Sequence, residues 1–236
     1  MEKIMLGTVY LNGEPREPGV LYSGEQIRLG QSVPGMEIQW VRLSSGLLIA
    51  DRCVCTQISW EQLHSQGLVF GTVIQIDGKG YLCRCLKVGI KGGDANEWDA
   101  ALAEVGEDNE VWHWAGQYFW GQETPEGWAS SRAVRGYHSA RNWNYYDATY
   151  RDVHVGFRPA LDPLAPAPLD YGPLVGTEIT FIGLDSETIS GKLAYFTDYD
   201  LVLEAASSLP DVCKWAIPDG ERVIIDRASV AWLREV

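Results

Sequence analysis

A proline-rich segment constrains the fold of this chain more than any other feature. Five of the fifteen residues from Pro159 to Pro173 are proline, and no helical pattern of apolar residues runs through them. Proline lacks a backbone N–H donor and fixes φ, so a segment of this composition behaves as a semi-rigid spacer. The sequence therefore predicts a domain at 1–160, a linker at 161–172 and a second domain at 173–236, and a chain of 236 residues is long enough for two cores.

Short apolar and β-branched runs separated by turn residues predict strands on both sides of that linker. Asn12-Gly13 and Asp77-Gly78 are dipeptides typical of two-residue β-hairpin turns, because both turn positions need a positive φ. In the second domain, successive apolar runs with turns between them predict a small antiparallel barrel.

Two helices are expected to interrupt the strands of the first domain. Ser59 followed by Gln62 is a capping-box sequence, and Asn96 precedes an acidic first turn in NEWDAALAEVG. Residues 111–157 contain few aliphatic side chains and almost no regular period. That segment predicts long loops packed around aromatic side chains.

The charge balance argues against one class of partner. Lys and Arg number 19 against 32 Asp and Glu, which gives a formal net charge of −13. Affinity for a phosphate backbone comes from Lys and Arg, so we expect no nucleic-acid ligand. The start MEKIMLGTVYL lacks a basic region followed by a long apolar run, and no stretch reaches the roughly 18 apolar residues of a membrane span. We expect no signal peptide, no membrane contact, and a cytoplasmic or virion-associated location.

Five cysteines lie at Cys53, Cys55, Cys83, Cys85 and Cys213. Their odd number and spacing do not match a secreted disulfide framework, and zinc ligands are usually spaced C-x2-C rather than C-x-C. Because residues i and i+2 of a strand share a face, the two C-x-C pairs are expected to be small core residues. We expect no metal and no other cofactor.

The end of the aromatic segment carries a motif, RAVRGYHSAR at 132–141 followed by a polar run and VGFR at 155–158. This order resembles the ending of proteins with the C-type lectin fold of the formylglycine-generating-enzyme type. The matching residues are Arg132, Arg135, Gly136, Ala140, Arg141, Val155, Gly156, Phe157 and Arg158. The resemblance covers residues 45–160 and implies two short helices in a loop-rich, Trp-rich domain. With an all-β barrel after it, the expected fold class is α+β.

Enzymes of that family use side chains that this sequence lacks or spaces differently. Formylglycine-generating enzymes bind copper through paired cysteines late in the domain, and no cysteine lies between Cys85 and Cys213. The related iron-dependent sulfoxide synthases need three histidines, and His113, His138 and His154 lack the helical spacing of that site. We therefore expect no enzyme and assign no catalytic residue. A metal-dependent oxidase or synthase of this fold stays as an alternative.

The non-enzymatic branch of the family includes the variable proteins of diversity-generating retroelements, with which phages and bacteria vary a ligand-binding surface. Randomising the first adenine of an AAC codon yields Asn, Tyr, Asp or His, and eight of the thirteen residues at 142–154 are of these types. Tyrosine offers large contact area at low entropy cost, and the other three add adaptable hydrogen bonds. The predicted ligand-binding residues are Asn142, Asn144, Tyr145, Tyr146, Asp147, Tyr150, Asp152 and His154.

The composition of residues 142–154 also fits a purely structural role. A fixed loop whose Asn and Asp side chains bond their own backbone would contain the same residue types. Calcium-dependent sugar binding would need Glu-Pro-Asn or Gln-Pro-Asp with Trp-Asn-Asp, whereas the chain has Thr-Pro-Glu at 124–126 and Trp-Asn-Tyr at 143–145. The expected ligand is a protein or glycan bound without calcium. The expected frame consists of buried anchors Arg135 and Arg158 and the aromatic residues Trp112, Trp114, Trp120, Trp143 and Phe157.

The second domain resembles an Sm-like barrel, with Gly176, Gly191, Leu193, Asp198 and Leu203 at the matching positions. Such barrels bind RNA or form rings. From position 170 onward, however, twelve residues are acidic and five are basic. An RNA-associated protein is therefore the second alternative, and homo-oligomer formation through this barrel is the preferred expectation, which would make the chain multivalent.

Overall fold

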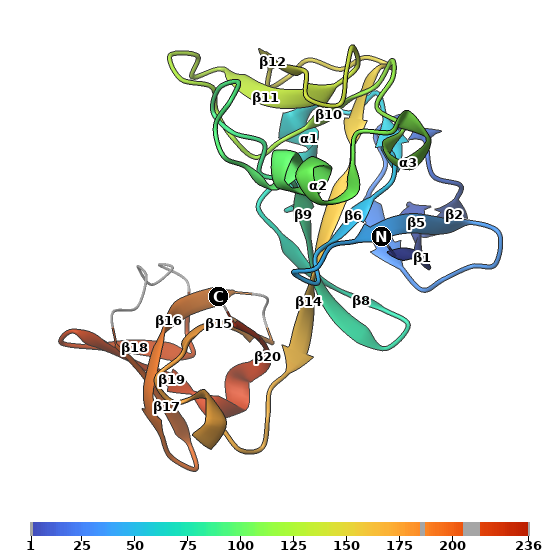
Figure 1. The fold of residues 1–236 in the computed structure, drawn as a ribbon. Coiled ribbons are helices and arrows are strands. Elements are labelled where there is room, and N and C mark those ends of the chain that lie inside the picture. The colour runs from blue at the N-terminus through green and yellow to red at the C-terminus, as the bar shows by residue number, and fades with distance from the viewer. Residues whose placement is uncertain (1, 185–186, 205–212, 236) are drawn as a thin grey trace. The chain divides into compact units, whose positions relative to one another are not determined.

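A computed structural model describes residues 2–184, 187–204 and 213–235 (Figure 1). By its internal contacts the chain divides into two compact units, Met1–Pro163 and Leu164–Val236, and each unit is described by itself. The boundary falls inside a strand, so part of the proline-rich segment is regular structure. Within the described ranges, no helix has the length and apolar character that crossing a membrane requires.

Unit 1 contains two β-sheets. The first sheet has the strand order β14 (Pro159–Pro166), β6 (Leu48–Ala50), β5 (Glu37–Arg42), β1 (Glu2–Leu11) and β2 (Glu14–Arg16). β1 also pairs with β4 (Ile27–Gly30), and β14 also pairs with β9 (Lys79–Cys85), whose hairpin partner is β8 (Thr72–Ile76). The second sheet has the order β12 (Trp143–Asp147), β11 (Ser131–Gly136), β10 (Tyr118–Trp120), β13 (Val155–Phe157), β7 (Cys55–Thr56) and β3 (Val20–Leu21).

Both predicted hairpin turns are confirmed. β1 and β2 pair up to Leu11 and Glu14, so Asn12 and Gly13 form a two-residue turn with φ values of 50° and 84°. β8 and β9 are joined in the same way across 77–78. These local signals succeed because a two-residue turn fixes the register of the strands that flank it.

The two predicted helices are also confirmed, and a third is added. In α1 (Trp60–Ser65), Ser59 Oγ accepts a hydrogen bond from the Gln62 N–H at 3.2 Å, and Gln62 Oε1 accepts one from the Ser59 N–H at 3.0 Å. In α2 (Glu97–Val105), Asn96 Oδ1 accepts from the Asp99 N–H at 2.8 Å. The additional helix, α3 (Asn109–Trp112), has only four residues.

The expected α+β class is wrong, because the fold is predominantly β, with 47% strand against 11% helix. Much of the difference lies in 111–157, where β10, β11, β12 and β13 replace the expected loops. β10 pairs in parallel with β13, at Tyr118 and Val155, and β13 pairs with β7 from a distant part of the chain. These strands are short and are stabilised by partners far away in the sequence. They therefore show little alternation of apolar and polar residues.

Unit 2 is an antiparallel sheet in the order β18 (Ala216–Asp219), β19 (Arg222–Asp226), β17 (Asp200–Glu204), β16 (Thr188–Phe196), β15 (Glu178–Gly183), β20 (Val230–Glu235) and the end of β14. It also contains the 3-10 helices η1 (Gly172–Leu174) and η2 (Arg227–Ser229). The predicted Sm-like barrel is not shown. Among the described residues the strand order has ends at β18 and β14, with no ladder joining them. Closure depends on strand tilt and stagger, which a pattern of apolar runs does not specify.

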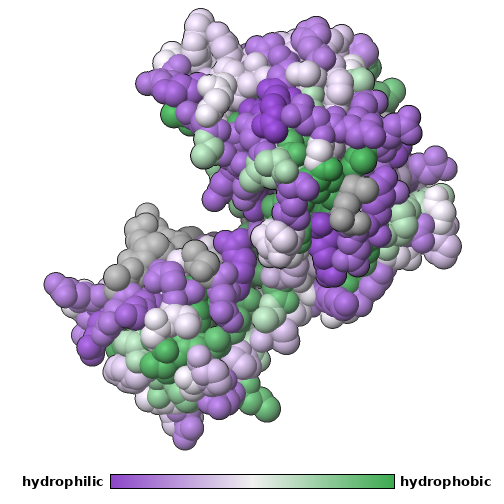
Figure 2. Space-filling view, viewed as in Figure 1, coloured by the Kyte–Doolittle hydropathy of each residue, from purple (hydrophilic) through white to green (hydrophobic). Residues whose placement is uncertain are grey.

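Two hydrophobic clusters fill unit 1 and a third fills unit 2. Cys53, Cys55, Cys83 and Cys85 are all buried free thiols in the unit 1 clusters, which confirms their predicted place in the core. Burial raises the pKa of Cys53 to about 11 and that of Cys83 to about 12. On the face drawn in Figure 2, hydrophilic side chains cover most of the surface, with smaller hydrophobic areas among them.

We expect the four core thiols to be unreactive in the native protein, because the thiolate is the reactive form and burial disfavours it. In a Cys213→Ser chain, 5,5′-dithiobis(2-nitrobenzoate) should label no thiol before unfolding and all four after unfolding in guanidinium. The measurement is the absorbance of the released thiolate. Labelling of any one thiol in the native chain would mean that a C-x-C pair is accessible to solvent.

Candidate functional site

A pocket with a volume of about 380 Å³ opens on the second sheet of unit 1. Its walls come from β10, from the turn after β11, from β12, and from the segment that leads into β13. The lining residues are Tyr118, Tyr137, His138, Asn144, Tyr146, Tyr150, Asp152, His154 and Val155. Five of the eight predicted ligand-binding residues are thereby brought together, although composition alone pointed to them.

Four tyrosine rings line the pocket, and each of them contacts at least one of the others. Tyr118 stacks on Tyr137, with ring centroids 4.9 Å apart and planes 13° apart. Tyr146 stacks on Tyr150, at 4.6 Å and 19°. Tyr118 meets Tyr146 edge to face, at 5.5 Å and 77°. Each ring is held by at least one other ring, and such pairs are stabilising beyond their burial. The array is therefore ordered before any ligand arrives.

The backbone after β11 places Tyr137 in this array. Gly136 and Tyr137 both have positive φ, at 100° and 72°. The Tyr137 N–H donates to the Trp114 carbonyl at 2.9 Å and to the Gln117 carbonyl at 3.1 Å. A positive φ is uncommon for an aromatic residue and persists only where the surrounding structure enforces it. These two hydrogen bonds hold Tyr137 in that conformation.

Two asparagines fix the phenol at the base of the pocket. Tyr118 Oη accepts hydrogen bonds from Asn142 Nδ2 at 3.2 Å and from Asn144 Nδ2 at 3.4 Å. Burial, followed by the neighbouring Tyr118 phenol, raises the pKa of Tyr146 to about 12. Among these rings the neutral phenol is strongly preferred over the phenolate.

Some of the predicted contact residues also bond their own backbone, as the fixed-loop alternative predicts. Asp147 Oδ1 accepts from the Thr149 N–H at 2.9 Å and from Thr149 Oγ1 at 2.6 Å, and these bonds lower the pKa of Asp147. Asp152 Oδ1 accepts from the His154 N–H at 2.9 Å. Asp147 is exposed and outside the pocket, whereas Asp152 lines it. The two carboxylates thus shape the segment, and only Asp152 also faces the cavity.

Strand alternation separates Tyr145 from the pocket. Residues 144 and 146 of β12 line the cavity, so the side chain of Tyr145 points to the other face of the strand. There its ring lies 5.1 Å from that of Trp128 and 5.9 Å from that of Trp143. Asn142 precedes the strand and donates to the Gly136 carbonyl at 2.9 Å. The structure therefore does not place Asn142, Tyr145 or Asp147 in the pocket lining.

Sequence reasoning missed three lining residues with polar side chains, namely Tyr118, Tyr137 and His138. Tyr137 and His138 lie inside the RGYHSAR part of the motif, between residues that carry the resemblance. Their position inside the motif was the signal that could have identified them as site residues. Nothing local marks Tyr118, which sits in the buried run of β10.

Two buried arginines hold the frame behind the pocket, as predicted. Arg158 is completely buried; its Nη2 donates to the Trp112 carbonyl at 2.6 Å, and its guanidinium carbon lies 4.7 Å from the centre of the Phe119 ring. Burial lowers the pKa of Arg158. Arg135 is also buried and its Nη2 donates to the Asp99 carboxylate at the start of α2. Of the predicted frame aromatics, the buried ones are Trp112, Trp120 and Phe157, and the partly buried ones are Trp114 and Trp143.

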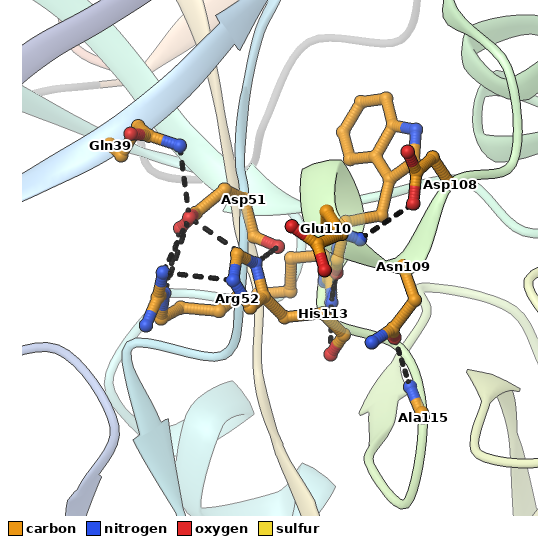
Figure 3. A network of polar contacts seen from close by, with 10 residues as sticks. Gln39, Asp51, Arg52, Asp108, Asn109, Glu110, His113 and Ala115 are labelled. Carbon is orange, nitrogen blue, oxygen red and sulfur yellow. Dashed lines mark hydrogen bonds and ion pairs between the residues drawn. The ribbon is translucent and has the colours of Figure 1, made fainter.

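A separate polar cluster surrounds the buried carboxylate of Asp51, and its members point toward one another in Figure 3. Asp51 Oδ2 accepts from Arg52 Nη2 at 2.9 Å and from Gln39 Nε2 at 3.2 Å, and His113 Nδ1 lies 3.4 Å away. Arg52 Nη2 can only donate, so His113 Nε2, 3.1 Å from it, acts as the acceptor in this arrangement. The groups satisfy one another and tie the end of α3 to β5.

Comparison of the chain with protein-family models, with curated proteins and with solved structures returned no match. Within the described ranges, no three His, Cys, Asp or Glu side chains are grouped so that they could hold a metal ion.

We expect Gly136→Ala to lower the free energy of unfolding of unit 1 by about 3 kcal/mol or more, because of strain and a clash. A Cβ at this position would lie 2.5 Å from the Gln117 carbonyl oxygen. The matched control is Gly127→Ala, which has a similar φ of 80° and no atom within 4 Å of the added Cβ. The control should cost only about 1 kcal/mol. Denaturant unfolding followed by Trp fluorescence compares the two, and equal losses would contradict the close packing behind Tyr137.

We expect Asp51→Ala to destabilise unit 1 by about 2–4 kcal/mol, since three donors would lose a shared buried acceptor. Glu110→Ala is the control, because Glu110 is an exposed carboxylate on α3. Its removal should change stability by no more than about 0.5 kcal/mol. Denaturation midpoints at constant slope give both values. A stable Asp51→Ala chain would show that the cluster does not hold α3 in place.

Proposed function

We propose that this protein recognises a protein or glycan ligand without chemically altering it, and that the pocket lined partly by residues 144–154 is the contact surface. The observation that carries the proposal is the convergence of Asn144, Tyr146, Tyr150, Asp152 and His154 on one cavity. They come from a strand and from the segment after it. Residues that were predicted to bind a ligand from their types alone thus line one pocket.

The chemistry of the lining supports binding. Tyrosine and histidine rings combine apolar faces with polar edges, and rigid aromatic side chains lose little entropy when a ligand is bound. The Tyr118–Tyr137 and Tyr146–Tyr150 stacks hold these rings in place. A pocket of about 380 Å³ is within the usual range for small-molecule sites.

The separation of frame from surface supports the further proposal that the chain is a variable protein of a diversity-generating retroelement, of phage or prophage origin. Arg135, Phe157 and Arg158 are buried and hold the second sheet. Tyr150 and His154, by contrast, are exposed. Exchanging exposed residues among Asn, Tyr, Asp and His would alter the ligand while leaving the frame intact.

The DNA around the gene tests this proposal. We expect a near-identical template repeat of the coding region for residues 142–154, an adjacent reverse transcriptase gene, and differences from the template confined to its adenines. Among independent isolates, codons for Asn144, Tyr146, Tyr150 and Asp152 should vary, and those for Arg135 and Arg158 should not. Sequencing the locus in several isolates provides the measurement. An invariant segment without a template repeat would contradict diversification.

A further inference from the structure

The charge of the pocket points to the kind of ligand group that it accepts. Asp152 contributes a carboxylate, and none of the nine lining residues is Lys or Arg. Arg151, between Tyr150 and Asp152 in the sequence, is exposed and is not in the lining. A positively charged group would therefore meet the Asp152 carboxylate and, within the lining, no arginine or lysine; the lining also holds the imidazoles of His138 and His154.

The aromatic faces add to this preference. The face of an aromatic ring is the negative side of its quadrupole and attracts cations within about 6 Å. Tyr118, Tyr137, Tyr146 and Tyr150 all line the cavity.

Three acceptor atoms of the lining already receive hydrogen bonds from the protein. Asn144 Oδ1 already accepts from the Tyr145 N–H, and Asp152 Oδ1 accepts from the His154 N–H. Tyr118 Oη already accepts from two asparagine amides. A primary ammonium or a guanidinium must place three to five donors on the acceptors that remain, such as Asp152 Oδ2 and the other phenol oxygens, whereas a fully methylated ammonium needs none.

We infer that the tyrosine pocket binds a trimethylammonium group, through the tyrosine ring faces that the two stacks leave uncovered and the Asp152 carboxylate. The inference rests on the proposed function and names the chemical class of its ligand. Tyr150 and His154 are exposed at the pocket, so the rest of the ligand extends into solvent. Choline carried on a glycan and trimethyl-lysine on a protein present the same head group.

Isothermal titration of the full chain with choline and with 3,3-dimethyl-1-butanol tests the inference, because the second compound has the same shape without the charge. We expect choline to bind at least about tenfold more tightly. Nε-trimethyl-lysine amide, titrated in parallel, distinguishes a methylated lysine from a choline-bearing ligand. Equal binding of choline and its neutral isostere, or no binding of either cation at millimolar concentration, would overturn the inference.

Matched variants locate the site. Tyr150→Leu should weaken choline binding about tenfold, whereas Tyr150→Phe, which keeps the ring face, should stay within about threefold. Asp152→Asn should also weaken it while keeping an acceptor for the His154 N–H. Tyr145→Leu, on the other face of β12, should bind as the unchanged chain does. Loss of choline binding in Tyr145→Leu but not in Tyr150→Leu would place the site elsewhere.

The two proposals can fail separately. Methyl glycosides of common sugars, titrated against the same variants, provide neutral ligands. If a methyl glycoside binds, choline does not, and Tyr150→Leu abolishes the binding, then the pocket recognises ligands but the trimethylammonium inference is wrong. If choline binds and the isolates show no variation at 142–154, the trimethylammonium inference holds and the proposal of diversification is wrong.

Discussion

Burial of the Arg158 guanidinium is the interaction on which the rest of unit 1 depends. Its Nη2 donates to the Trp112 carbonyl, and the faces of Trp98 and Phe119 lie 5.1 and 4.7 Å from its guanidinium carbon. A buried charge is strongly unfavourable unless it is compensated. Because Nε and Nη1 have no hydrogen-bond partner among the described residues, the compensation of Arg158 requires the Trp112 carbonyl of α3 and the ring faces of α2 and β10. This requirement joins segments that are far apart in the sequence and fixes β13, which ends one residue earlier, beside β10.

The pocket is a consequence of that arrangement. Pairing of β10 with β13 sets Tyr118 beside Val155, and pairing of β11 with β12 sets Asn144 opposite Val134. A third buried arginine, Arg84, also supports α2 by bonding to Glu97, and it bonds to Asp162 as well; burial opposes its charge, but these carboxylates raise its pKa. The buried arginines thus belong to the frame, whereas Tyr150 and His154, which line the pocket, are exposed.

Much of the local structure could be predicted because its causes lie within a few residues. The Ser59–Gln62 capping box, the Asn96 cap and both two-residue turns follow from short-range geometry. Strand alternation accounts for Cys83 and Cys85 of β9, whereas Cys53 precedes β7 and packs in a different cluster from Cys55. The parallel pairing of β10 with β13 and the open strand order of unit 2 could not be predicted in this way. Both depend on which distant strands meet, and apolar patterns do not encode that choice.

The sequence by itself determined part of the chemistry of the candidate site, since the Asn, Tyr, Asp and His composition of 142–154 is independent of any fold. Only the tertiary structure decided which of these side chains act together. Pairing with β11 makes 143–147 a strand, and side chains of a strand alternate, so Tyr146 enters the pocket and Tyr145 does not. The positive φ of Tyr137, enforced by carbonyls at 114 and 117, brings in a ring that composition could not have assigned.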